Sequence, residues 1–232
     1  MTASNPSLWH LYTSGSGNYA HNMAMDQSLL ENAAVAGYPI LRFYSWTEPA
    51  ASFGYFQKYA EIEQVTLLRP LVRRPTGGGL VPHDADWTYS VAVPPSNPWY
   101  DLKAVESYRR VHEWVCAAFA KVGVAAELAP CCRKTLPGQC FVGWEQFDVL
   151  WSGRKIAGAA QRRTRDGLLI QGSVQPPPLK LNRADWESAM CEVAQSERGV
   201  EWRDFSPGET MLKRANALAS GTYSSDAYNR KR

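Results

Sequence analysis

The fold of this chain is decided by one stretch, Arg73-Arg74-Pro75-Thr76-Gly77-Gly78-Gly79-Leu80-Val81-Pro82-His83-Asp84. Three consecutive glycines are costly to order, because glycine loses more backbone freedom on folding than any other residue. We therefore predict a loop whose bare backbone approaches a ligand. Its N–H groups point at a carbonyl or phosphate oxygen, and the two arginines supply positive charge. A flexible turn between two strands is the alternative, and the spacing alone does not separate the two.

Length and composition favour a globular protein. The chain has 232 residues, 45% of them hydrophobic, with nine tryptophans to fill a core. Its net charge of +3 is too mild to indicate nucleic-acid binding. No apolar run approaches the ~20 residues that span a bilayer, and the N-terminus lacks the features of a signal peptide. We expect a cytoplasmic protein that binds neither nucleic acid nor membrane.

The five cysteines are expected to be reduced thiols, since an odd number cannot pair within one chain and no secretion signal is seen. Three of them, Cys131, Cys132 and Cys140, lie close together in sequence. They lack the spacing of a zinc site, so no metal is expected.

The apolar pattern predicts an α+β fold. Strands in clusters with helices at intervals favour a mixed, largely antiparallel sheet with flanking helices. Asp101 and Asn182 are expected to cap two of the helices. Helices are predicted at 22–35, 102–122, 182–194 and 209–219, and strands at 40–44, 51–56, 71–73, 88–93, 147–151, 155–162 and 168–174.

Seven other stretches, together with the glycine stretch, match one family in order from near residue 20 to near residue 175. They are Asn22-Met23-Ala24-Met25-Asp26, Leu41-Arg42-Phe43-Tyr44-Ser45-Trp46, Ser52-Phe53-Gly54-Tyr55-Phe56-Gln57-Lys58, Thr88-Tyr89-Ser90, Cys140-Phe141, Gly153-Arg154-Lys155-Ile156-Ala157-Gly158-Ala159-Ala160-Gln161 and Gln171-Gly172-Ser173. On these residues the chain resembles the biotin/lipoate A/B protein ligase superfamily. Within its lipoate–protein ligase A branch, it is most similar to cysteine-dependent octanoyltransferases of the LipM/LipL type.

The resemblance implies a fold like the catalytic domain of biotin protein ligases and class II tRNA synthetases. We expect one such domain over residues 1–219 and a disordered polar tail at 220–232. It also implies transfer of an octanoyl or lipoyl group from acyl carrier protein to a lysine of a lipoyl-carrier domain. Such domains occur in the glycine cleavage H protein and in E2 subunits. The reaction needs no cofactor and passes through a cysteine thioester.

Two other functions stay open. An ATP-dependent lipoate–protein ligase would use ATP and Mg to form an acyl-adenylate. Ligases of the full-length type carry an accessory C-terminal domain, and only ~55 residues follow the last predicted strand here, which is small for a second domain. The third possibility is a protein that binds an acyl group or nucleotide without turnover.

Cys140 and Lys155 are the expected catalytic residues. A thiol with a pKa of ~8.5 needs a cationic neighbour to become a good nucleophile at neutral pH. The resemblance places the matching lysine beside the cysteine in octanoyltransferases, and against the acyl carbonyl in ligases. Without it, a buried structural cysteine and an ordinary strand lysine would be the commoner assignments.

Substrate binding is assigned to the glycine stretch and two later strands. The resemblance gives Arg74 a contact to the ligand, whereas Arg73 is expected to pack on the opposite face. His83 is expected to shape the loop, and Asp84 to be structural. The remaining expected binding residues are Thr76, Gly77, Gly78, Gly79, Leu80, Val81, Pro82, Gly158, Ala159, Gly172 and Ser173.

Two positions depart from the family pattern, and four arginines lie close to Lys155 in sequence. Gln171 replaces a frequent histidine and cannot titrate. Gly143-Trp144 replaces a usual Pro-Ser pair, which leaves the acyl-chain preference open. A rim of Arg154, Arg162, Arg163 and Arg165 is either an attraction for acidic carrier proteins or an ordinary solvated face.

Overall fold

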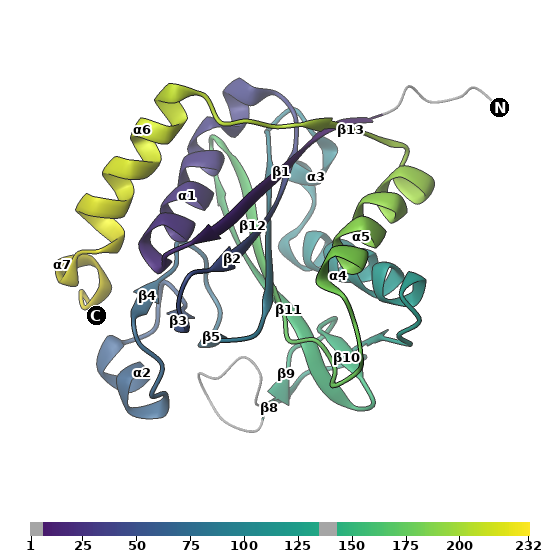
Figure 1. Ribbon diagram of the computed structural model, residues 1–232, viewed down its shortest axis with the longest axis horizontal. Coiled ribbons are helices and arrows are strands. Elements are labelled where there is room, and N and C mark those ends of the chain that lie inside the picture. The colour runs from purple at the N-terminus through teal and green to yellow at the C-terminus, as the bar shows by residue number, and fades with distance from the viewer. Residues whose placement is uncertain (1–6, 135–142) are drawn as a thin grey trace.

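A computed structural model describes residues 7–134 and 143–232, with a mixed eight-stranded sheet at its centre (Figure 1). Helices pack on both faces of the sheet, and a smaller sheet carries the glycine stretch. The strands are β1 (Ser7–Gly17), β2 (Ile40–Trp46), β3 (Ala50–Phe53), β4 (Leu71–Arg73), β5 (Val81–His83), β6 (Trp87–Val93), β7 (Glu127–Leu128), β8 (Arg133–Lys134), β9 (Gly143–Trp144), β10 (Val149–Trp151), β11 (Arg154–Thr164), β12 (Gly167–Val174) and β13 (Val200–Asp204). The helices are α1 (Tyr19–Ala36), α2 (Tyr59–Val65), α3 (Pro98–Asp101), α4 (Ala104–Lys121), α5 (Arg183–Arg198), α6 (Glu209–Leu218), the π-helix η1 (Ala219–Tyr223) and α7 (Asp226–Asn229).

The main sheet has the strand order β13-β1-β2-β6-β12-β11-β10-β7. The first three strands, β13, β1 and β2, run parallel to one another. The pairing of β2 with β6 and all later pairings are antiparallel. Short turns can join antiparallel strands, so β10, β11 and β12 follow one another directly in sequence. The prediction of an α+β fold with a largely antiparallel sheet is confirmed.

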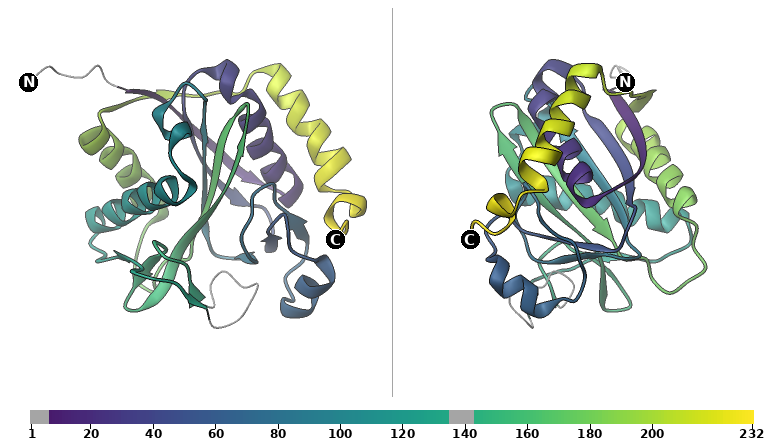
Figure 2. Two further views of the ribbon diagram at one scale, coloured as in Figure 1. Left: turned by 180° about the vertical axis from the view of Figure 1, so that it is seen from behind. Right: turned by 60° about the vertical axis from the view of Figure 1, so that its left-hand side comes forward.

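The two faces of the sheet differ in chemistry. On β2, Leu41 and Phe43 enter the largest core cluster, which includes buried residues of α4 and α5. The alternate residues Arg42 and Tyr44 face the side covered by α1 and are also buried. Helices α1 and α6 thus lie on one face, and α4 and α5 on the other (Figure 2). Because strand residues alternate between the two faces, polar side chains gather on the α1 face, where they can form a site.

The glycine stretch belongs to the smaller sheet, whose order is β4-β3-β5. Strand β4 runs parallel to β3, with Phe53 opposite Arg73, and β5 runs antiparallel, with Ala50 opposite His83. The chain therefore leaves β4, forms the glycine loop, and returns along the other side of β3. This brings Ser52, Arg74 and His83 to the end of the main sheet near β6 and β12.

Most predicted elements are present, with boundaries shifted by a few residues. Asn182 caps α5 as predicted, accepting a bond from the backbone N–H of Ala184. The prediction that Asp101 caps the long helix is wrong. Asp101 ends the short helix α3, which Asn97 caps with Pro98 at the first turn, and α4 begins only at Ala104. Asn followed by Pro is itself a strong helix-start signal.

Strands β1 and β13 were not expected. They pair in parallel at the edge of the main sheet, with Ser7 opposite Val200. The sequence of β1 is rich in serine and glycine, so it does not show the alternation typical of a strand. Within residues 7–134 and 143–232, no helix has the length and apolarity to cross a bilayer.

The prediction of a disordered tail at 220–232 is wrong. Tyr223 is fully buried and α7 follows it. The buried guanidinium of Arg73 donates to the carbonyl oxygens of Tyr228 and Asn229, at 3.3 and 2.9 Å. The Asn229 side chain accepts from the Arg73 backbone N–H at 2.8 Å and donates to the Tyr223 carbonyl at 2.8 Å. A buried arginine needs these acceptors, so it orders a segment whose composition is polar.

Replacing Asn229 with alanine is expected to lower the free energy of unfolding by about 1–3 kcal/mol, because buried polar partners lose their hydrogen bonds. The neighbouring variant Arg230→Ala removes an exposed ion pair to Asp226 and a contact over the Tyr59 ring. It should change the free energy of unfolding by less than about 1 kcal/mol. Urea unfolding of both variants checks this. Equal stability of the two would contradict an anchoring role for Asn229.

Candidate active site

Lys155 is buried in a pocket wall and paired with Asp148. The turn Ser152-Gly153 has positive φ at both residues, 48° and 71°, as a tight hairpin between β10 and β11 needs. Just beyond it a bulge shifts the register, so that Val149 faces Ala157 while Leu150 faces Lys155. A bulge redirects the side chains beside it. The Lys155 Nζ lies 2.7 Å from Asp148 Oδ2, with the two side chains 5% and 0% exposed.

Asp148 has further partners that keep it in place. The Tyr108 hydroxyl on α4 donates to Oδ1 at 2.5 Å, and the Glu145 backbone N–H donates to Oδ2 at 2.7 Å. A buried carboxylate requires such donors. Neither Asp148 nor Tyr108 was expected from the sequence. Asp148 lies within the strand predicted at 147–151, and nothing in the sequence links it to Tyr108, 40 positions earlier.

Gly158 provides the space in which the Lys155 side chain lies. A Cβ at this position would be 2.7 Å from Lys155 Cε and 2.8 Å from Nζ. Small residues here were expected to leave room for a ligand, but at Gly158 that room is occupied by the lysine itself. Ala159 and Ala160 do line the pocket.

Changing Gly158 to alanine is expected to displace the end of the Lys155 side chain, because the new Cβ would crowd its Cε and Nζ. A misplacement of about 1 Å at a reacting group can cost about 100-fold in rate. Acyl transfer should therefore fall by about that factor. Gly208→Ala serves as the matched control, since a Cβ there meets no atom within 4 Å. Unchanged transfer by Gly158→Ala would show that the position of Lys155 is not critical.

The glycine loop packs on Gly54, which follows β3. A Cβ on Gly54 would lie 1.9 Å from the carbonyl oxygen of Gly78. Gly78 itself has φ of 82°, in the region that favours glycine. No atom lies within 4 Å of a Cβ built on Gly77. Gly54 is thus required because the loop backbone lies against it, and Gly78 because of its positive φ. Gly54 was not among the expected site residues.

The two arginines before the loop lie on opposite faces, as alternation predicts. Arg74 is buried and lines the pocket, and its guanidinium donates to the carbonyls of Gly77 and Ser52 at 2.5 and 3.2 Å. It therefore holds the loop closed against β3. Arg73 is the anchor of the C-terminal segment and serves packing, as expected. Leu80 packs with Phe53 in a small core cluster beneath the loop.

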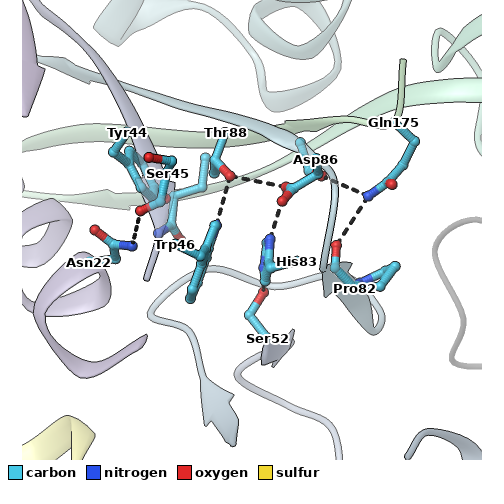
Figure 3. A network of polar contacts seen from close by, with 12 residues as sticks. Asn22, Tyr44, Ser45, Trp46, Ser52, Pro82, His83, Asp86, Thr88 and Gln175 are labelled. Carbon is cyan, nitrogen blue, oxygen red and sulfur yellow. Dashed lines mark hydrogen bonds and ion pairs between the residues drawn. The ribbon is translucent and has the colours of Figure 1, made fainter. Parts of the chain in front are cut away.

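His83 belongs to a buried polar network (Figure 3). Its Nε2 lies 2.8 Å from Ser52 Oγ, and its Nδ1 lies 2.9 Å from Asp86 Oδ2. The Trp46 ring stacks on the imidazole with centroids 3.9 Å apart. Both nitrogens are engaged within the protein, so the geometry favours a role in shaping the pocket. Asp84 is exposed and takes no part in this network.

The network continues across the sheet. Thr88 and Ser173 each donate to the same Asp86 oxygen, at 3.0 and 2.7 Å. Gln175 then links Ser173 to the Pro82 carbonyl, which it reaches at 3.1 Å (Figure 3). Ser173 and Pro82 were both expected to bind substrate. Pro82 acts through its backbone oxygen, as a fixed point between β5 and β12.

Gln171 connects the loop to a buried carboxylate. Its Oε1 accepts from the Thr76 hydroxyl at 2.7 Å, and its Nε2 donates to Asp26 Oδ2 at 2.7 Å. Asp26 also accepts from Arg42, Tyr44 and Ser90. An amide accepts and donates at once without a change in charge. Gln171 thus fits a positioning role. On the same carboxylate, burial together with the Asp26 charge raises the pKa of the Tyr44 hydroxyl well above its usual value.

The pocket lies across the main sheet. Gly158, Ser173, Thr88 and Tyr44 stand side by side on four successive strands. Three strand spacings give a floor about 14 Å long. Lys155 lies at the β11 end and Tyr44 at the other, with Met23, Ser52, Arg74, Val81, His83, Ala159, Ala160, Gln171 and Gly172 completing the lining.

A glycine is required at position 172 for a second reason, the packing of Tyr89. A Cβ there would lie 2.1 Å from Cζ of Tyr89, whose ring is fully buried. The residue was expected to make room for substrate, and the tight contact shows that it also makes room for a core tyrosine.

Cys140 lies outside the described residues, so its distance to Lys155 stays a prediction. Of the described cysteines, burial raises the pKa of Cys116 and Cys191 to about 12, which makes them poor nucleophiles at neutral pH. Gly143 and Trp144 form strand β9 against β8 and are not among the residues that line the pocket.

The expected basic rim does not surround Lys155. Arg163 and Arg165 lie at the far end of the β11–β12 hairpin, where the guanidinium of Arg163 donates to the Tyr100 carbonyl. Arg162 faces the half-buried Tyr55 ring, 5.8 Å away. Only Arg154 is next to Lys155, and it is exposed.

A family model described as the lipoyl protein ligase A/B catalytic domain matches residues 18–175. The chain belongs to this family. The matched range contains the glycine loop, the Asp148–Lys155 pair and Gln171. The prediction of the family from the eight stretches is confirmed.

Curated relatives are octanoyltransferases. Octanoyltransferase LipM of Carboxydothermus hydrogenoformans is 35% identical over 175 residues, which cover 72% of this chain and 64% of the relative. Octanoyltransferase LipM of Geobacillus kaustophilus is 36% identical over 180 residues, covering 72% and 65%. The chain thus spans just under two thirds of the length of these relatives.

Solved structures of lipoate ligases share the fold. Lipoate-protein ligase A bound with ATP superposes with a TM-score of 0.77 at 21% identity, covering 98% of this chain and 99% of the other. The bi-partite lipoate protein ligase of Thermoplasma acidophilum, studied with its E2 lipoyl domain, has a TM-score of 0.73 at 20% identity, covering 97% and 96%.

Proposed function

We propose that this lipoyl ligase family member is an octanoyltransferase. It moves an octanoyl group from acyl carrier protein to a lysine of a lipoyl-carrier domain, through a thioester on Cys140 and without ATP or metal. The observation that carries the proposal is a buried Lys155–Asp148 pair at one end of an elongated pocket, in a chain 35% identical to an octanoyltransferase over 175 residues. A floor about 14 Å long suits a medium-chain acyl group.

In the first half-reaction, the Cys140 sulfur attacks the carbonyl carbon of the donor thioester. The tetrahedral intermediate collapses, the carrier thiolate leaves, and it takes up the proton released by Cys140. Lys155 contributes positive charge near the sulfur and favours the thiolate. Since its Nζ already contacts the Asp148 carboxylate at 2.7 Å, we assign it an electrostatic role and not that of a base.

In the second half-reaction, the uncharged amine of the acceptor lysine attacks the enzyme thioester. The amide forms, Cys140 leaves as a thiolate, and the amine proton passes to it. Backbone N–H groups of the Gly77–Pro82 loop would stabilise the oxyanion in both steps. The contacts of Arg74 and Gly54 with this loop hold its backbone in a preformed arrangement.

One observation favours a second candidate. The fold matches that of lipoate-protein ligase A bound with ATP along nearly the whole chain. A ligase would activate free octanoate or lipoate as an acyl-adenylate, which the acceptor lysine of the lipoyl-carrier domain then attacks.

Mass spectrometry of apo glycine cleavage H protein separates these functions. The protein is incubated with octanoyl-acyl carrier protein without ATP, or with octanoate or lipoate plus ATP and Mg. A gain of one octanoyl group in the first mixture supports the transferase. A gain only in the second would establish a ligase, and no gain in either would favour a protein that binds without turnover.

The variant Cys140→Ser is expected to lower ATP-independent transfer by at least about 1000-fold, because a serine hydroxyl is a far weaker nucleophile than a thiolate. The wild type should also show a hydroxylamine-sensitive octanoyl adduct in its intact mass, and the variant should not. Cys131→Ser, at an exposed cysteine nearby in sequence, is the control. Full activity of Cys140→Ser would remove this residue from the mechanism.

A further inference from the structure

Half of strand β11 has an open edge. On one side β12 pairs with it from Ala157 to Thr164. On the other side β10 pairs with it only from Arg154 to Ala157. No other strand in residues 7–134 and 143–232 pairs with the remaining length of that edge. An unpaired edge is a ready template for another strand, and proteins usually cover or interrupt it.

The phase of the ladder shows which backbone groups point outward. The Gln175 N–H donates to the carbonyl of Ile156 on the β12 side. Residues of an antiparallel strand alternate in the direction of their N–H and C=O groups. Ala159, Gln161 and Arg163 therefore direct both groups away from β12. Strand β11 ends at Thr164, which pairs with Gly167 of β12 at the hairpin turn, so Arg163 is the last outward-facing residue.

Two side chains along this edge are held by residues of α3 and α4. Gln161 is held on the α4 face, where its amide bonds to the Ala104 carbonyl and the Ser107 hydroxyl. Arg163 is held by the Tyr100 carbonyl. The register shift between β10 and β11 lies before the open part, at Lys155–Ala157.

The open edge leads directly into the pocket. Ala159, its first outward residue, lines the pocket, and Lys155 lies four residues earlier on the same strand. A segment that pairs with Ala159 and Gln161 would place its next residues at the pocket mouth. Exposed Arg163 and Arg165 stand at the other end and would complement an acidic partner.

We propose that the β11 edge from Ala159 to Arg163 binds an extended segment of the acceptor domain as an added strand. Main-chain hydrogen bonds hold the segment, as in other strand-addition complexes, and its register brings the target lysine to the pocket. This inference rests on the proposed function, because it assigns the surface to the acceptor of the acyl group.

Proline at position 161 tests the edge directly. It removes only the outward N–H of that residue, and proline is tolerated on an edge where this group faces solvent. The control Gln161→Ala loses the same side-chain bonds to Ala104 and Ser107. With apo glycine cleavage H protein, Gln161→Pro should raise the acceptor KM at least about fivefold over Gln161→Ala. Self-octanoylation by the donor should be equal in the two variants.

Amide hydrogen exchange on the wild type measures binding of the acceptor without acyl transfer. Adding apo glycine cleavage H protein should slow exchange at Ala159, Gln161 and Arg163. Protection without acyl transfer would keep this docking site and overturn the proposed function. The docking proposal would be overturned by acyl transfer without slowed exchange, or by equal acceptor KM values for the two variants. It would also be overturned if a high concentration of this chain alone, without H protein, slowed the exchange.

Discussion

Replacing Asp148 with alanine is expected to lower the free energy of unfolding by about 3–5 kcal/mol, because it removes the carboxylate that lies 2.7 Å from the buried ammonium of Lys155. The Tyr108 hydroxyl and the Glu145 N–H lose their acceptor in the same change. Octanoyl transfer should fall by at least about 100-fold, since Lys155 is then free to leave its position. Urea unfolding and single-turnover transfer to apo H protein measure the two effects.

A double variant separates stability from catalysis. Asp148→Asn with Lys155→Met removes both charges and keeps similar volumes, so it should recover most of the stability lost by Asp148→Ala. Transfer should remain as low as in the single variant, because the ammonium proposed to favour the Cys140 thiolate is then absent. Glu61→Ala removes an ion pair in which both side chains are more than two-thirds exposed and should cost less than about 0.5 kcal/mol. Wild-type transfer by Asp148→Ala would exclude the assigned positioning role.

The second large effect is expected for Gly54→Ala. The new Cβ would lie 1.9 Å from the Gly78 carbonyl oxygen, which is a backbone atom and cannot rotate away. The loop must move as a whole, at a cost of about 3 kcal/mol, the upper part of the range for overpacking. For a chain of this size this corresponds to a fall of about 6–12 °C in melting temperature.

Gly77→Ala is the matched control within the same loop, since its Cβ meets no atom within 4 Å. It should melt within about 1 °C of the wild type. Calorimetry of the two variants compares them directly. A larger loss in Gly77→Ala than in Gly54→Ala would contradict the close approach of the loop to β3.

Much of the fold follows from local pattern. The helix α4 has a buried stripe at three- and four-residue steps, and the chain from β10 to β12 has turn residues at the right intervals, so both were predictable. Capping by Asn182 was also readable, because the signal lies within a few residues of its effect. Strands β1 and β13 were not readable, since their stability comes from pairing with each other and, through β1, with β2, and not from local preference.

The candidate site shows the same division. Lys155, Arg74 and the glycine loop were identified from contiguous stretches that match a family. Asp148 and Tyr108 were not, because the bond between them joins residues 40 positions apart. The tail was assigned to disorder from its polar composition, yet the buried Arg73 needs acceptors and finds them at Tyr228 and Asn229, 155 and 156 residues away.

The triple glycine, the order of the matching stretches and the periodicity of the helices specify the family and the α+β class, since these are properties of neighbours along the chain. The placement of Lys155 against Asp148, the requirement for Gly54 beneath the loop and the open edge of β11 depend on which distant segments meet in space. Burial of charge and contact between backbones act through distance in three dimensions, so these features become defined only when the sheets assemble.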